Sequence, residues 1–200
     1  MKRTTVIAFL LVLGAGTWLQ AQDVPARYDE ARSAYQSGNL EDARFALQQA
    51  LNEINQVVGR EILNLLPAEW NGMTIDTAAD NVTGTSAGFA GLYVNRGYTG
   101  ENREASIEII SDSPMLASLN AVLTMPAFMA SDQNQKRIKV SNYKALMTKD
   151  VDEQGNASYE IQVPCSSLLL TISCSGIQDE DEAVNMANSL PVDQIVKLTR

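Results

Sequence analysis

The sequence predicts an α+β protein: an N-terminal helical hairpin followed by an antiparallel sheet with two packed helices. Three observations support this class. Apolar and small residues recur at helical spacing up to about residue 66, short alternating stretches follow from residue 67, and two further helical patterns interrupt them. We therefore divide the chain into a signal peptide (residues 1–21), a helical hairpin (22–66) and an α+β domain (67–200).

Residues 1–21 have the parts of a secretory signal. Lys2 and Arg3 give the positive start, residues 6–13 the apolar core, and a small-residue cleavage site ends at Ala21, before Gln22. The apolar run is shorter than the roughly 20 residues that span a bilayer, and the cleavage site has no cysteine to carry a lipid. An uncleaved anchor is the alternative. We expect a periplasmic or secreted protein with no integral membrane segment after signal removal.

Charge and composition exclude several functions. Loss of Lys2 and Arg3 with the signal changes the net charge from -9 to -11. Such an acidic chain, with no basic run, repels phosphate backbones, so no nucleic acid partner is expected. The chain has no histidine, which excludes Ser-His-Asp and Cys-His catalysis and removes the commonest zinc and copper ligand. We expect no cofactor and no metal site.

The two cysteines, Cys165 and Cys174, invite a disulfide in an exported protein. Residues 167–173 are typical of one strand, so the two Cα atoms would lie roughly 25–30 Å apart if Cys165 continues that strand. A corner at residues 164–166 would shorten this distance, but not to the about 4.4–6.8 Å that a disulfide needs. We expect no bridge between them, and a small buried apolar role for Cys174.

The helical hairpin is predicted from its apolar spacing and its turn, where Gly38 ends the first helix and Asn39 caps the second. The periodic residues are Ala31, Ala34, Tyr35, Leu40, Ala43, Leu47, Ala50, Leu51 and Ile54. About 25 residues here resemble one tetratricopeptide unit, at Ala31, Tyr35, Gly38, Ala43, Leu47 and Ala50. No second copy follows, so an isolated hairpin is preferred over a peptide-binding array.

The region after residue 67 is predicted to form the sheet. Expected strands are residues 89–96, 105–109, 137–140, 143–148, 159–163 and 168–174, with a turn at 97–102 and a polar loop at 150–158. Their close succession favours antiparallel pairing, and the last strand is expected to be central. One helix follows Ser113-Pro114 and ends before Pro126, and another covers residues 179–189 before a short final turn.

At this level the chain resembles an uncharacterised family of exported bacterial proteins. The residues that carry the resemblance are Leu66-Pro67 with Trp70 and Gly72, residues 112–115, and residues 168–175 followed by an acidic helix. The C-terminal part is also similar in its order of elements to the small PsbP/Mog1-like sandwich. That resemblance implies binding and assembly rather than catalysis. Cys174 stands where the resemblance implies a glycine.

The candidate binding residues are mostly apolar. Met115, Met125, Phe128 and Met129 lie in one segment, and we group Trp70 with them. Methionine clusters can hold Cu(I), but the apolar helical context favours core packing or an exposed apolar lip. Residues 179–182 concentrate four carboxylates without the spacing of a calcium loop, and are expected to complement a helix dipole instead.

Two functional classes remain. The first is an exported non-enzymatic binding or assembly module of the bacterial envelope, which holds a protein or an apolar ligand in a groove between the sheet, residues 115–129 and the hairpin. The alternative is a periplasmic hydrolase that uses carboxylates or a Ser-Lys pair such as Ser141 and Lys144. Such a pair needs a buried lysine, whereas Lys144 is expected to face solvent. We prefer the binding module and expect no catalytic residue.

Overall fold

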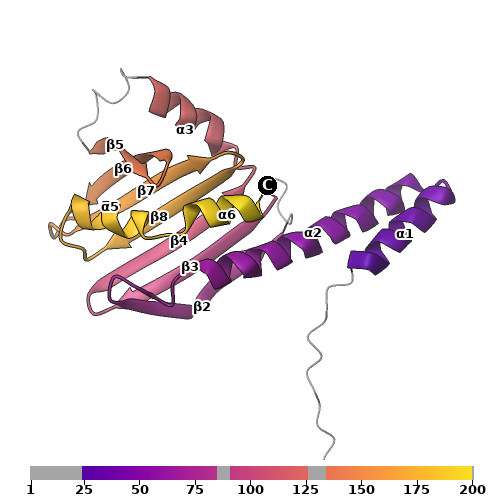
Figure 1. Cartoon of the computed structure of the whole chain (residues 1–200), viewed down its shortest axis with the longest axis horizontal. Coiled ribbons are helices and arrows are strands. Elements are labelled where there is room, and N and C mark those ends of the chain that lie inside the picture. The colour runs from indigo at the N-terminus through magenta and orange to yellow at the C-terminus, as the bar shows by residue number, and fades with distance from the viewer. Residues whose placement is uncertain (1–23, 85–90, 126–133, 200) are drawn as a thin grey trace, which may run out of the picture.

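A computed structural model describes residues 24–84, 91–125 and 134–199. The expected signal peptide at residues 1–21, and Phe128 and Met129, lie outside the described residues. The chain begins with two helices, continues into an eight-stranded antiparallel sheet, and adds further helices on both of its faces (Figure 1). This is the α+β class that the sequence predicts. No helix in the described part of the chain is both long and apolar enough to cross a membrane.

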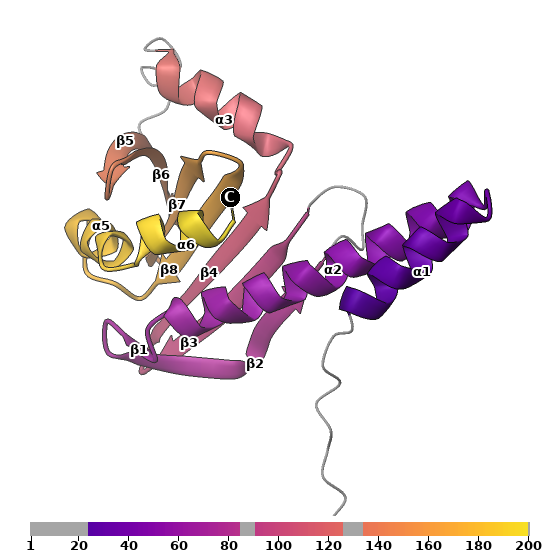
Figure 2. The same cartoon turned by 45° about the vertical axis from the view of Figure 1, so that its right-hand side comes forward.

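The helical hairpin forms as predicted. Helix α1 (Val24–Gln36) and helix α2 (Leu40–Leu65) are joined by a tight turn in which Gly38 has a φ of +79°. The Asn39 side chain accepts a hydrogen bond from the Asp42 N–H at 3.3 Å, which satisfies one of the free donors at the start of α2. The second half of α2 lies against the sheet, and the first half extends beyond it with α1 alongside (Figure 2).

The sheet has the order β1-β2-β3-β4-β8-β7-β6-β5, and all neighbours are antiparallel. Its strands are β1 (Glu69–Trp70), β2 (Met73–Thr83), β3 (Tyr93–Gly100), β4 (Arg103–Ser111), β5 (Gln135–Val140), β6 (Tyr143–Val151), β7 (Ala157–Cys165) and β8 (Leu168–Ser175). The last strand is central, as the sequence predicts, because it pairs with β4 on one side and β7 on the other.

Three local expectations differ from the structure. The β1–β2 hairpin was not predicted, although Asn71 and Gly72 both have positive φ angles and form the kind of two-residue turn that Asn-Gly favours. Residues 97–100 continue β3 rather than turning, because Tyr98 is buried in the core. The final turn is a helix, α6 (Val192–Leu198), which buries Val192, Ile195 and Val196.

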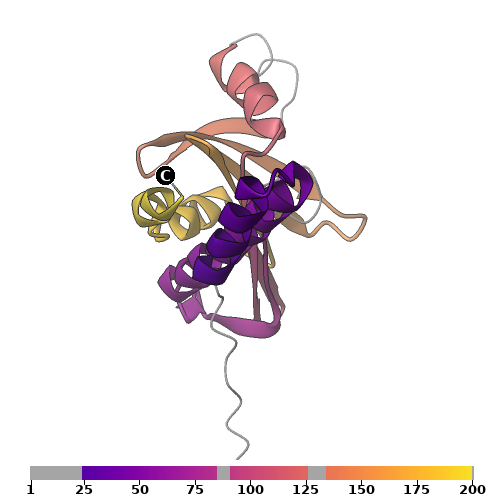
Figure 3. The same ribbon diagram turned by 90° about the vertical axis from the view of Figure 1, so that its right-hand side faces the viewer.

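The helices cover the two faces of the sheet unequally. The end of α2, together with α5 (Glu180–Asn188) and α6, packs against the main core on one face (Figure 3). Helix α3 (Met115–Thr124) packs on the opposite face, where Leu119 and Leu123 meet Leu146 and Leu169 in a small separate cluster. Alternation along β8 explains the split, since Leu169 points away from its neighbours Leu168 and Leu170.

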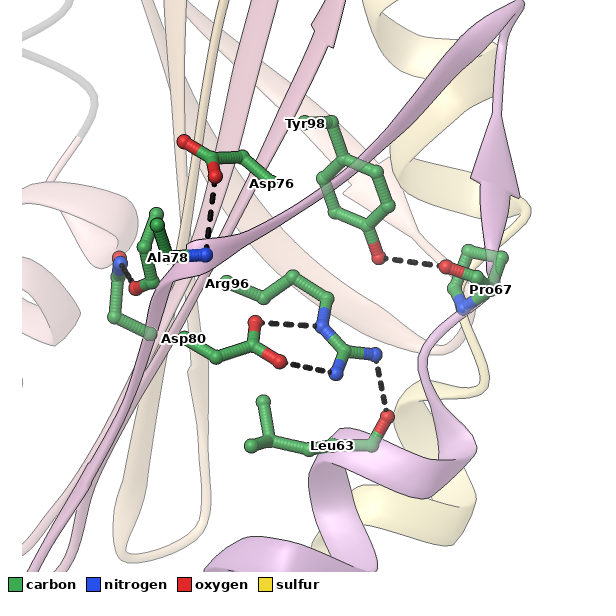
Figure 4. Close-up of polar contacts among 9 residues, drawn as sticks. Leu63, Pro67, Asp76, Ala78, Asp80, Arg96 and Tyr98 are labelled. Atoms are coloured by element: carbon green, nitrogen blue, oxygen red, sulfur yellow. Dashed lines mark hydrogen bonds and ion pairs between the residues drawn. The ribbon is translucent and has the colours of Figure 1, made fainter.

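A buried ion pair attaches α2 to the sheet. Arg96 on β3 is 8% exposed and binds the Asp80 carboxylate with two bonds, from Nε at 2.9 Å and from Nη2 at 2.6 Å (Figure 4). Its Nη1 donates at 2.7 Å to the Leu63 carbonyl in the last turn of α2, which also accepts the Leu66 N–H at 3.2 Å. One guanidinium therefore joins β2, β3 and the C-terminal end of α2.

Candidate functional site

Trp70, a candidate binding residue, lies in the core. Its side chain is 3% exposed, and its indole N–H lies within hydrogen-bonding distance of the Ser189 Oγ at 2.9 Å and the Met186 carbonyl at 3.2 Å. Its ring contacts Tyr98 with the centroids 5.2 Å apart, and the Tyr98 hydroxyl donates to the Pro67 carbonyl at 3.0 Å. Trp70 thus joins α5 to the sheet and offers little surface to a ligand.

Met115 and Met125 lie at the two ends of α3 and are 50% and 51% exposed. They are on the opposite face of the sheet from Trp70 and α2. The described residues therefore do not bring the sheet, α3 and the hairpin together around one groove. Arg137 on β5 fixes the end of α3, because its Nη2 donates to the Val122 and Met125 carbonyls at 3.0 and 2.6 Å.

Polar side chains line an open concavity of about 660 Å³ over β4, β6, β7 and β8. Its lining includes Glu104, Ser106, Asp150, Ser158, Glu160 and Ser173. The three carboxylates are exposed, whereas a catalytic acid of the lysozyme type is enclosed in apolar surroundings. Lys144, the lysine of the suggested Ser-Lys pair, is also exposed, and the Ser141 N–H is bound by the Asn188 Oδ1 at 2.8 Å.

The acidic run at residues 179–182 has a structural place at the start of α5. Asp179 is the N-cap, and its side chain accepts the Glu182 N–H at 2.9 Å. Glu182 in turn accepts the Gln178 N–H and binds Arg103 and Asn71, contacts that lower the pKa of its carboxyl, the Gln178 bond most. These contacts agree with the predicted role at the helix terminus.

Cys165 and Cys174 are free and buried. Cys165 pairs with Leu168 across the β7–β8 turn, and Cys174 lies six positions further along β8, so their Cα atoms are separated by about 20 Å. Burial raises the pKa of the Cys165 thiol to about 12 and that of the Cys174 thiol to about 11. Both side chains are therefore protonated core residues at neutral pH.

We expect neither thiol to react with a water-soluble disulfide reagent at pH 8 while the protein is folded. The reagent needs an accessible thiolate, and both the burial and the raised pKa of Cys165 and Cys174 oppose this. The reagent releases a coloured thiolate for each thiol that reacts. Its absorbance should show no reactive thiol per protein molecule in buffer and two in denaturant. Fast reaction of the reagent with either thiol in the folded protein would contradict the structure.

The hairpin carries most of the exposed large apolar side chains among the described residues. They are Tyr28, Tyr35, Leu40, Phe45, Leu47, Leu51, Ile54 and Val57, each between 43% and 69% exposed. Single exposed apolar residues are ordinary, but a contiguous group on one element marks an interaction surface. These residues were not predicted as a binding site.

The interior of the hairpin is made of small residues. Ala31 on α1 and Ala43, Ala46 and Ala50 on α2 are buried between the two helices. An ion pair between Arg27 and Glu53, at 3.4 Å, also joins α1 to α2. The usual pattern of an amphipathic helix is thus reversed here, since small side chains face the partner helix and large ones face solvent.

In comparisons with known proteins, no family model and no curated protein matches this chain.

Proposed function

We propose that the protein is an exported, non-enzymatic binding or assembly module of the bacterial envelope, and that the hairpin is its docking element. The observation that carries the proposal is the row of large apolar side chains that Leu40, Leu47, Leu51 and Ile54 form along one side of α2. Burial of such side chains against a partner stabilises a complex by about 25 cal/mol for each Å² removed from water. The partner is therefore a protein with an apolar surface.

Export rests on the signal-like residues 1–21 and fits the rest of the chain. The net charge of -11 after loss of residues 1–21 favours solubility of the exported protein, and the buried protonated thiols of Cys165 and Cys174 resist oxidation in an oxidising compartment. The hydrolase alternative would have to use the open polar concavity. Its carboxylates lie on the surface of that concavity, which supports binding of a polar group more than acid catalysis.

Photocrosslinking in a bacterial host tests the proposal. A photoreactive residue at position 51 should give adducts of higher mass in the envelope fraction, and the recovered protein should begin at Gln22. The same residue at position 45 is the matched control, because Phe45 is similarly exposed, at 57% against 50% for Leu51, but lies about 120° from Leu51 around α2. Equal adducts at both positions, or none at position 51, would contradict the docking role.

A further inference from the structure

Four exposed apolar residues of α2 form one row with an arginine among them. The row is Leu40, Arg44, Leu47, Leu51 and Ile54, separated by 4, 3, 4 and 3 residues, so it follows one side of the helix. It lies roughly 90° around α2 from the buried alanines that face α1. The same side continues to Val58, which packs against the main core, so the uncovered row ends at Ile54.

Helix α1 carries a shorter row of the same kind. Tyr28, Arg32 and Tyr35 are exposed and are separated by 4 and 3 residues. They lie roughly 100° around α1 from Ala31 and Ala34, which face α2, in the same rotational sense as the row on α2. In an antiparallel pair of helices, similar rotations in the same sense point to the same side. We call the two rows together the hairpin face.

The two charged residues of the hairpin face are both arginines, and each is flanked by apolar residues of its own row. In the part of the chain that the structure describes, neither Arg32 nor Arg44 forms an ion pair, whereas Arg27 pairs with Glu30 and Glu53. The carboxylates of residues 24–54 lie roughly 90° or more around the helices from the two rows: Asp29, Glu30, Glu41, Asp42 and Glu53. The hairpin face is therefore apolar and positive, on a chain whose net charge is -9.

The arginines restrict what can cover the hairpin face. Covering an exposed charge with apolar surface costs free energy unless the charge is paired. A carboxylate is the best partner, because it can accept two parallel N–H bonds from one guanidinium. A second copy of the hairpin face offers arginines instead, and the negative net charge of the chain opposes approach to an anionic lipid surface. Charge complementarity thus favours an acidic protein partner.

A helix has the shape that fits the two rows. Helices α1 and α2 pack through small alanine side chains, and the two rows lie on either side of the line between the helices. A third helix laid along this line contacts both rows, as in other complexes in which a helix occupies a groove. The row on α2 extends from Leu40 to Ile54, which is about 21 Å or four turns of a helix.

We propose that the hairpin face docks an amphipathic helix of another protein, one that carries carboxylates on both flanks of its apolar side. This inference rests on the proposed docking role and adds the chemistry of the partner. The apolar side of the helix covers the leucines of α2 and the tyrosines of α1. The carboxylates on one flank bind Arg32, and those on the other bind Arg44.

Two synthetic helical peptides test the proposal on the purified protein, expressed from the full chain. Both have the same leucine stripe, which is flanked by glutamates in one peptide and by lysines in the other. Fluorescence anisotropy should show that the protein binds the glutamate peptide at least about tenfold more tightly at low ionic strength. The net charge of -9 alone would favour the lysine peptide. Preference for lysine, equal binding, or binding of neither peptide would overturn the inference.

Charge reversal locates the effect. Arg44→Glu should reduce the preference for the glutamate peptide about tenfold, and adding Arg32→Glu should reverse the preference. The matched control is Lys139→Glu, because it makes the same change in charge at an exposed residue of β5, whereas α2 packs against β2 and β3. Lys139→Glu should keep the preference, and all variants should keep the far-ultraviolet circular dichroism of the wild type. Equal effects of Arg44→Glu and Lys139→Glu would contradict the role of the hairpin face.

Photocrosslinking separates this inference from the docking role. With the photoreactive residue at position 51, Arg44→Glu should remove most of the adducts, and Lys139→Glu should not. Mass spectrometry of the adduct should identify a segment with carboxylates on both flanks of an apolar stripe. Adducts that persist unchanged in Arg44→Glu, or that contain a second copy of this chain, would overturn the inference and leave the docking role standing. If position 51 gives no adducts in the otherwise unchanged chain, the docking role itself falls.

Discussion

Replacement of Arg96 by methionine should lower the free energy of unfolding by about 3–5 kcal/mol, the cost of breaking a buried ion pair by removing one partner. Methionine keeps most of the apolar stem but leaves the Asp80 carboxylate, 20% exposed, without its cation. It also removes the guanidinium bond to the Leu63 carbonyl at the end of α2, which then keeps only the Leu66 N–H at 3.2 Å. Urea unfolding followed by tryptophan fluorescence measures the loss, since Trp70 is buried beside this region.

Two controls separate the ion pair from general effects of the substitution. Arg103→Met removes a more exposed arginine, 29% accessible and paired with Glu182, and should cost about 1 kcal/mol or less. The double variant of Arg96→Met with Asp80→Leu should recover part of the loss, because no unpaired charge then remains. If Arg96→Met lowers the free energy of unfolding by no more than Arg103→Met does, the ion pair is not important for attaching α2 to the sheet.

Replacement of Gly176 by alanine should cost about 3 kcal/mol or more. Two effects add together at this position. Gly176 has a φ of +69°, a conformation that costs a residue with a Cβ about 1–2 kcal/mol. A Cβ there would also overlap the Asn102 carbonyl oxygen in the β3–β4 turn and approach the Arg103 Cα to 3.1 Å. Both are backbone atoms, one in the β3–β4 turn and one in the first residue of β4, so they move only if the turn and the start of β4 are distorted.

Gly155→Ala is the matched control for the Gly176 variant. Gly155 has a φ of +87° in the β6–β7 loop, and an added Cβ would meet nothing within 4 Å. It should therefore show the conformational cost alone, about 1–2 kcal/mol. The thermal unfolding midpoints of the two variants are compared with that of the wild type. Equal decreases would mean that the close approach of Asn102 to position 176 does not contribute to the loss of stability.

The sequence predicts the elements with strong periodicity well. The hairpin, α3, α5 and the four C-terminal strands all have regular apolar spacing, and the structure confirms them. Strand β2 was missed because its sequence, MTIDTAADNVT, does not alternate. Its register shifts between Asp76 and Asn81, where the Asp76 side chain accepts the Ala78 N–H at 3.0 Å, so no period of two extends along it. The Asn71-Gly72 turn was the available signal for this hairpin.

The candidate site was harder to predict because apolar spacing does not reveal what covers a residue. Leu47 and Ala50 belong to one wide apolar face in the sequence, yet only Ala50 is buried. The same spacing would be expected if a further helix of the chain covered Leu47. Trp70 is the opposite case, because it was predicted to bind a ligand and is buried in the core. The sequence around a large aromatic residue near a turn does not distinguish a core position from an exposed one.

The order of the strands also limits how this protein associates. One edge of the sheet consists of the two-residue β1 and of β2 beyond Thr74, whose register shifts between Asp76 and Asn81. The other edge is β5, where three of the six residues are basic: Lys136, Arg137 and Lys139. Short strands, irregular strands and lysine-rich strands at an edge all oppose pairing with strands of another molecule. Strand-to-strand addition, the usual route to aggregation, is therefore disfavoured at both ends of the sheet. A concentrated solution of the protein should therefore resist the formation of fibrils through strand addition.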